Sequence, residues 1–178
     1  MKTASILLAF AVVVALPVAA AAGGEFVSPV SAMANSWDGY YSSPIMAIDG
    51  SHDTHWTSGY SPENETSRWI YFQLTGETNG GPGEFIPVNG VEVTVDENYL
   101  PIRVSVEAET LHRYILFPTL RTIVSNVTVT NETAPDGKFF LPFDTVDASF
   151  LKFIVTPLSK SDTYGHYTTM SEVRVSVE

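Results

Sequence analysis

The chain has 178 residues, of which 20 are acidic and nine are basic, so its net charge at pH 7 is −11. Between Glu25 and Leu100 the only basic residue is Arg68. Nucleic acid and anionic membrane surfaces are therefore disfavoured as partners, because binding to either depends on clustered Lys and Arg. Neutral sugars, cations or another protein remain. Because the chain has no cysteine, thiol chemistry and disulfide cross-links are excluded.

The N-terminal segment has the pattern of a secretory signal peptide. Lys2 supplies a positive charge, an apolar run extends from Ile6 to Val18, and small residues follow as far as Gly24. The alternative is a retained membrane anchor, which needs about 20 apolar residues. The small residues that follow the apolar run favour cleavage of the segment by signal peptidase over its retention as an anchor. We predict a signal peptide at residues 1–22 and one secreted domain at 23–178.

Alternation of apolar and polar residues dominates the rest of the chain and predicts strands with one buried face. We expect about eight, at 26–30, 69–74, 91–95, 104–108, 127–129, 139–143, 151–155 and 173–177. The strand at 69–74 is apolar on both faces, which predicts a central position. Gly-, Pro- and Asn-rich breaks separate the strands, and no segment sustains a helical period. The pattern indicates a single all-β domain, a sandwich or barrel.

Oxygen donors are concentrated in the segment that follows Ala47. Asp49-Gly50 is a turn signal, and Ser51, Asp53 and Thr54 follow it within four residues. Calcium requires six to eight oxygen ligands, and a tight turn can direct side-chain and backbone oxygens to one point. On these residues alone, an ordinary Asx turn without metal is the favoured interpretation.

Taken together, these motifs resemble the discoidin family. The resemblance consists of A-x-D-G-x-x-x-T-x-W-x-S from Ala47 to Ser58, a second tryptophan that opens a strand (Trp69), a late strand at 146–153, and S-E-V-x-V from Ser171. The family includes the coagulation factor V/VIII C-type domains and the family 32 carbohydrate-binding modules. The resemblance spans nearly all of residues 23–178. It implies a jelly-roll β-sandwich of about eight antiparallel strands.

The resemblance also implies one structural calcium ion. Its side-chain ligands would be Asp49, Thr54 and Glu172, and its carbonyl ligands Met46, Ser51 and Ser171. One cation held by two carboxylates more than 120 residues apart in the sequence would close a long loop, which is where a cross-link stabilises most in theory.

Aromatic residues in loops are the candidates for ligand contacts, because aromatic faces with polar neighbours stack on sugar rings or fill a partner's pocket. Trp56 and Trp69 are expected in the core instead. Family members that bind galactose usually have an Arg in the loop corresponding to 96–99, whereas this chain has Asp96 and Glu97. The candidate ligand-binding residues are Trp37, Tyr40, Tyr41, Tyr60, Arg68, Tyr99, Arg103, Tyr164, His166 and Tyr167.

Three Asn-x-Thr sequons begin at Asn64, Asn126 and Asn131. In an exported chain they predict a glycosylated protein, although chance occurrence in a Thr-rich β-protein explains them equally well.

No combination of residues offers a nucleophile, a base and an orienting group together, so we predict that the chain is not an enzyme. We predict a secreted, calcium-stabilised module that recognises carbohydrate on a cell surface or matrix through loops at one end of the sandwich. The alternative is a structural or adhesive surface protein that self-assembles or docks an extracellular protein with the same scaffold.

Overall fold

The computed structural model describes residues 24–37, 39, 42–59, 67–76, 84–111, 118–158 and 167–178. In this part of the chain all regular structure is β-strand or short 3-10 turn, and no helix is long and apolar enough to span a membrane. The strands are β1 (Glu25–Val27), β2 (Ser31–Ala34), β3 (Trp56–Thr57), β4 (Arg68–Gln73), β5 (Ile86–Thr94), β6 (Ile102–Leu111), β7 (Pro118–Val129), β8 (Lys138–Pro157), β9 (Thr169–Met170) and β10 (Glu172–Val177). The 3-10 turns are η2 (Pro44–Ala47), η3 (Glu97–Tyr99) and η4 (Pro135–Gly137).

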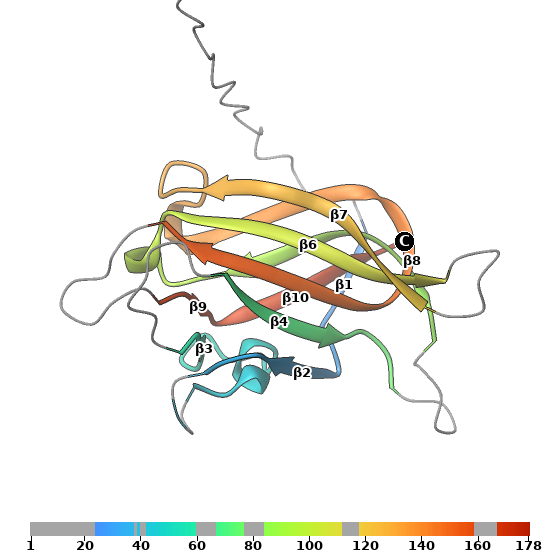
Figure 1. Ribbon diagram of the computed structural model, residues 1–178, viewed down its shortest axis with the longest axis horizontal. Helices are drawn as coiled ribbons and strands as arrows, with labels where there is room; N and C mark the ends of the chain where they lie inside the picture. Colours follow the sequence, from blue (N-terminus) through green and yellow to red (C-terminus); the bar gives the residue numbers. More distant parts are fainter. Residues whose placement is uncertain are drawn as a thin grey trace, which may run out of the picture.

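Eight strands form one antiparallel sheet that folds into two layers (Figure 1). The first layer has the order β1-β10-β5-β8, and the second runs from β2 through β4 and β8 to β6 and β7. Strand β8 belongs to both layers because it reverses direction near its middle. Lys138 pairs with Thr94, Ala148 pairs with both Ile86 and Thr110, and Pro157 pairs with Ile102. Both ends of β8 therefore lie at one end of the sandwich.

The core lies between the layers and is built by the alternating residues. Val91 and Val93 of β5, and Val104 and Val106 of β6, are all fully buried. Trp56 of β3 is also fully buried, as expected from the sequence. Full burial of a Val or larger apolar side chain contributes about 1.5–3 kcal/mol, so this row of valines is a main source of the stability of the domain.

The predicted all-β sandwich is confirmed, but several boundaries differ. The strands expected at 139–143 and 151–155 are the two halves of β8. The strand expected at 26–30 ends at Val27, and Pro29, which lacks a backbone N–H, cannot continue a sheet ladder. Strands β2, β3 and β9 were not predicted, because two to four residues are too few to show a period. The segment predicted as a signal peptide lies outside the described residues.

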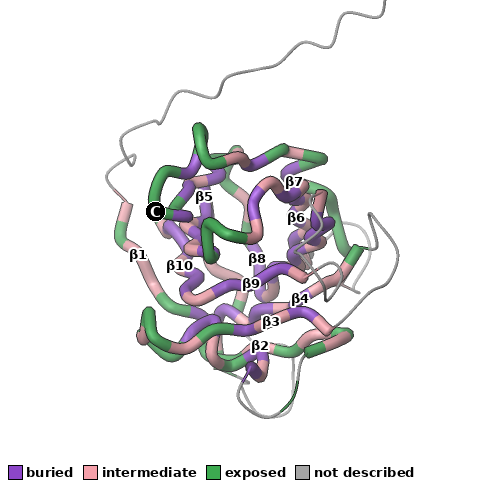
Figure 2. The backbone as a smooth tube through the Cα atoms, turned by 90° about the vertical axis from the view of Figure 1, so that its left-hand side faces the viewer, coloured by how far each residue is buried: buried purple, intermediate pink, exposed green. Residues whose placement is uncertain are grey.

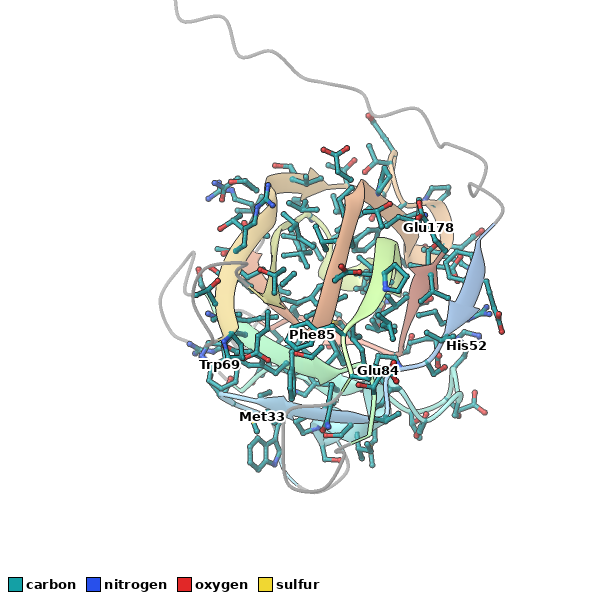
Figure 3. All side chains as sticks on the ribbon, turned by 90° about the vertical axis from the view of Figure 1, so that its right-hand side faces the viewer. Met33, His52, Trp69, Glu84, Phe85 and Glu178 are labelled. Carbon is teal, nitrogen blue, oxygen red and sulfur yellow. The ribbon has the colours of Figure 1, made fainter. Side chains whose placement is uncertain are left out.

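Trp69 is not a core residue, which corrects the expectation from the sequence. Ile70 and Phe72 of β4 are fully buried, so alternation places Trp69 and Tyr71 on the outer face of the second layer, where both are half-buried. Their rings meet edge to face at 5.1 Å between centroids. Figure 3 shows Trp69 at the edge of the molecule.

Candidate functional site

One end of the sandwich gathers the described ends of four connections whose sequences carry most of the candidate ligand-binding residues. The described ends of the connections at 35–43 and 58–67 are tied to it by hydrogen bonds. The indole Nε1 of Trp56 donates to the Ser36 carbonyl at 3.0 Å. Ser58 donates its N–H to the Thr168 carbonyl at 2.9 Å, and its Oγ accepts from the Thr168 N–H at 3.0 Å. The two bonds between Ser58 and Thr168 join segments 110 residues apart in the sequence.

The connections at 95–101 and 158–168 reach the same end. The N–H of Asp96 donates to Oγ1 of Thr169 at 3.0 Å. The N–H of Leu158 donates to the Pro101 carbonyl at 3.0 Å. Figure 2 views the molecule from this end, with β3 and β9 in front. The two short strands, paired through Trp56 with Met170, therefore hold the bases of these connections together. We call this end the loop end.

Four of the candidate ligand-binding residues are described at the loop end. Trp37 follows β2 and is 51% exposed. Arg68 opens β4 and is half-buried, on the same side of the strand as Ile70. Tyr99 and Tyr167 are also half-buried. Tyr99 lies in η3, which is fixed by Asp96, whose Oδ1 accepts the N–H of Asn98 at 2.9 Å.

Arg103 has a different position. It pairs with Thr156 and Thr128, whereas its neighbours Ile102 and Val104 are buried, so Arg103 lies on the outer face of the second layer. The remaining candidates lie outside the described residues; they are Tyr40, Tyr41, Tyr60, Tyr164 and His166.

A shallow cavity of about 320 Å³ opens at the same end of the molecule, where the 95–101 connection meets the turn that follows β7. Leu100, Pro101, Asn131 and Glu132 contribute to its walls. The volume of this cavity is at the lower end of the range of small-molecule binding sites, about 300–1,000 Å³. Sequence reasoning did not identify it, because its walls come from two connections that show no shared pattern.

The Asp49-Gly50 turn has the geometry that its sequence predicts. Gly50 has φ +77°, a conformation that favours glycine because other residues meet steric resistance there. Oδ1 of Asp49 accepts the N–H of Ser51 at 2.9 Å, and its Oδ2 accepts the Thr54 hydroxyl at 2.7 Å. The same hydroxyl lies 3.3 Å from the Ser51 carbonyl. Oxygens of three predicted calcium ligands therefore converge.

Glu172 meets this turn from the start of β10. It is 7% exposed, and the backbone N–H of Gly50 acts on its carboxylate in the direction that lowers the pKa. Burial raises the pKa of Glu172 above its usual value. The positive charges of His52 and Arg174 oppose that rise, and the negative charge of Asp49 adds to it. The Asp49 and Glu172 carboxylates are therefore close enough to interact.

The donor set fits a calcium ion. Oε2 of Glu172 is buried and has no hydrogen-bond partner among the described residues, and a buried oxygen without a partner is costly unless something binds it. Met46 lies in η2, which packs against β10, and Ser171 precedes Glu172. No three His, Cys, Asp or Glu residues of the described chain are grouped for metal binding. Calcium does not require such a group, because hydroxyl and carbonyl oxygens can also serve as its ligands.

Two of the three sequons are described, and both are accessible. Asn126 lies on β7 with φ +52°, and its N–H donates to Oγ of Ser105 at 2.9 Å. Asn131 lies in the turn after β7, and both asparagines are exposed. Asn64 lies outside the described residues. Glycosylation at all three positions stays a prediction.

No family model matches the sequence, and no curated protein sequence shows a significant match. Solved structures do match the fold. Chitosan-binding module 2 of a Paenibacillus sp. IK-5 chitosanase/glucanase, solved with chitotriose, has a TM-score of 0.60 at 20% identity, covering 82% of this chain and 95% of that one. The family 32 module of AlyQ, in complex with 4,5-unsaturated mannuronic acid, has a TM-score of 0.58 at 18% identity, covering 85% and 97%.

A family 32 module from Clostridium perfringens, in complex with GalNAc-β-1,3-galactose, also matches, with a TM-score of 0.58 at 19% identity, covering 83% of this chain and 94% of that one. The matches span most of both chains in each case. This chain therefore has the β-sandwich fold of family 32 and related carbohydrate-binding modules, the fold that its resemblance to the discoidin family implies.

Proposed function

We propose that this chain is a secreted module that binds carbohydrate at the loop end and has no catalytic activity of its own. The observation that carries the proposal is the convergence of four connections on one end of a sandwich whose solved relatives in fold include glycan complexes. The described rim of that end combines an exposed indole, Trp37, with the half-buried side chains of Arg68, Tyr99 and Tyr167. Aromatic faces with a few polar groups are the usual composition of such sites.

The proposal includes a structural calcium ion at the Asp49 turn. The buried, unpartnered oxygen of Glu172 supports it, as does the convergence of the Asp49, Ser51 and Thr54 oxygens. An ion held between the turn and β10 would fix η2 and β3 against the first layer. Since β3 supports the connections at 35–43 and 58–67, the ion would also keep the ligand-binding residues in place.

The charge of the loop end indicates which sugars to expect. Asp96 and Glu97 are both exposed there, and the chain has a net charge of −11. Like charges across an interface slow association and weaken binding. The proposed ligand is therefore a neutral or amine-bearing oligosaccharide, in preference to a polymer of uronic acids.

Calorimetric titration with calcium present tests the binding proposal. The ligands are chitotriose, GalNAc-β-1,3-galactose and a mannuronate oligomer. We expect chitotriose or the neutral disaccharide to bind, and Tyr99→Ala or Arg68→Ala to weaken binding at least tenfold, which is about 1.4 kcal/mol. Tyr71→Ala is the matched control, because Tyr71 is an equally half-buried tyrosine on the outer face of β4. No heat with any of the three sugars, or equal losses in Tyr99→Ala and Tyr71→Ala, would contradict the proposed site.

A further inference from the structure

Exposed apolar side chains are concentrated in one part of the described chain. Only five large hydrophobic residues of the described residues are markedly exposed, and four of them fall between residues 30 and 45. They are Val30 (52%), Met33 (61%), Trp37 (51%) and Ile45 (47%). Met33 lies on β2 and Ile45 on η2, which packs beside β2, whereas Val30 immediately precedes β2 and Trp37 follows it three residues after its end. We call these four residues the β2 patch. Figure 3 shows Met33 at the bottom of the view, at the margin of the molecule.

The β2 patch lies on a sheet edge that carries almost no charge. Among the strands that the structure describes, β2 pairs only with β4, so one side of its backbone has no strand partner within the described residues. Residues 26–48 contain a single charged residue, Asp38, in a chain with 20 acidic and nine basic residues. Natural edge strands are commonly protected from association by charged side chains. This edge has none on β2 itself.

The opposite edge of the same layer differs. Strand β7 pairs only with β6, but it carries Arg121 among its exposed residues and is interrupted by register shifts opposite Val104 and Val106. Bulges and charges of this kind discourage edge-to-edge contact. The edge at β2 is therefore the one suited to association.

Charge identifies the partner. Two copies with a net charge of −11 each repel one another when charged surfaces meet. The uncharged β2 patch allows close approach without placing acidic side chains opposite each other. A twofold axis would bring the patch against itself and match apolar surface with apolar surface. Aliphatic Val30, Met33 and Ile45 are poor platforms for a polar sugar but suit a protein contact. We propose that the β2 patch is the interface of a homodimer.

The area of the patch is sufficient. Four half-exposed side chains of this size offer on the order of 400 Å² of surface. Since roughly 60% of an interface is non-polar, the whole contact would be about 700 Å² per copy and about 1,300 Å² in total. A stable specific interface needs about 1,200–2,000 Å² in total. The dimer is therefore expected near the lower limit of size, with modest affinity.

Sedimentation of the secreted protein without sugar, at protein concentrations of about 1 to 300 µM, detects a dimer whose Kd lies in that range. The wild type should show a monomer–dimer equilibrium. Met33→Glu should weaken association at least tenfold, because it introduces a charge at the contact in both copies. Leu120→Glu, with the same charge change at a 47% exposed position on β7, should leave association unchanged. Unaltered melting temperatures in both variants will show that neither acts through the fold.

Ionic strength provides a second readout. Raising the salt concentration from about 50 to about 500 mM screens the mutual repulsion of the two acidic copies, so an apolar dimer should tighten. A wild type that stays monomeric throughout the range overturns the proposal, as does equal weakening by Met33→Glu and Leu120→Glu. Trp37 belongs both to the β2 patch and to the rim of the loop end, so a dimer would cover part of the proposed sugar site. Dimerisation is therefore measured without sugar and sugar binding at monomer concentrations, so that a monomer that binds sugar and a dimer that does not are distinct outcomes.

Discussion

Replacing Glu172 by Gln removes the buried carboxylate that links the last strand to the Asp49 turn. If calcium binds there, a calcium concentration 100 times the Kd of the site raises the free energy of unfolding of the wild type by about 2.7 kcal/mol. For a chain of this size, each kcal/mol raises the melting temperature by about 2–4 °C. The expected increase is therefore about 5–11 °C, and Glu172→Gln should lose it.

Thermal unfolding with calcium and with EDTA measures this effect directly. Asp49→Asn should also lose the calcium-dependent increase, because the Asp49 carboxylate is the centre of the turn's hydrogen bonds. Asp53→Asn is the matched control. Asp53 lies in the same turn and is exposed, but only its backbone N–H takes part, donating to Oγ of Ser51 at 3.2 Å. Its variant should keep the full increase.

Two results would refute this reasoning. A wild type whose melting temperature is the same in EDTA and in millimolar calcium has no structural calcium site. An increase that Asp53→Asn abolishes as completely as Glu172→Gln does would place the ion elsewhere in the turn and remove β10 from the ligand set.

Three further predictions concern the fold and the charge at Glu172. Because burial raises the pKa of Glu172 in the folded state, the folded protein binds more protons than the unfolded chain near that pKa, so its stability falls as pH rises through it. In EDTA at pH 7, urea unfolding should show Glu172→Gln to be more stable than the wild type, with the difference vanishing at acidic pH; an unchanged difference would contradict this. Gly137→Ala should cost at least about 2 kcal/mol in urea unfolding, because its φ is +70° and a Cβ would overlap the Val95 carbonyl; a neutral effect would contradict the turn geometry. Trp56→Phe should cost about 1–3 kcal/mol, because it loses the hydrogen bond to Ser36 and leaves a cavity, and should therefore lower the melting temperature by about 2–12 °C; a variant as stable as the wild type would show that β3 does not hold the loop end.

The parts of the fold that were predictable are those with a local signal. The buried valines of β5, β6 and β10 follow strict alternation, and the Asp49-Gly50 turn follows from local residue chemistry. The core position of Trp56 was expected from the resemblance to the discoidin family. The reversal within β8 was not predictable, because the same strand chemistry continues on both sides of it and only long-range pairing with β5 and β6 distinguishes the halves.

The candidate site was predictable only in outline. The sequence places aromatic residues in several connections, but it does not show that the Ser58–Thr168 pair draws two of these connections together. Two-residue strands such as β3 and β9 show no period. The ion pair between Glu107 and Lys152, at 2.9 Å, has no local signal either, because the two residues lie 45 apart in the sequence on neighbouring strands.

The central claim is that carbohydrate binds at the loop end. Chemical-shift mapping of ¹⁵N-labelled protein during titration with chitotriose and with GalNAc-β-1,3-galactose tests it most directly. We predict that at least one sugar shifts the amides of Trp37, Tyr99 and Tyr167 while leaving β5, β6 and β10 unmoved. Unchanged spectra with both sugars, or shifts confined to the outer faces of the two layers, would contradict the account.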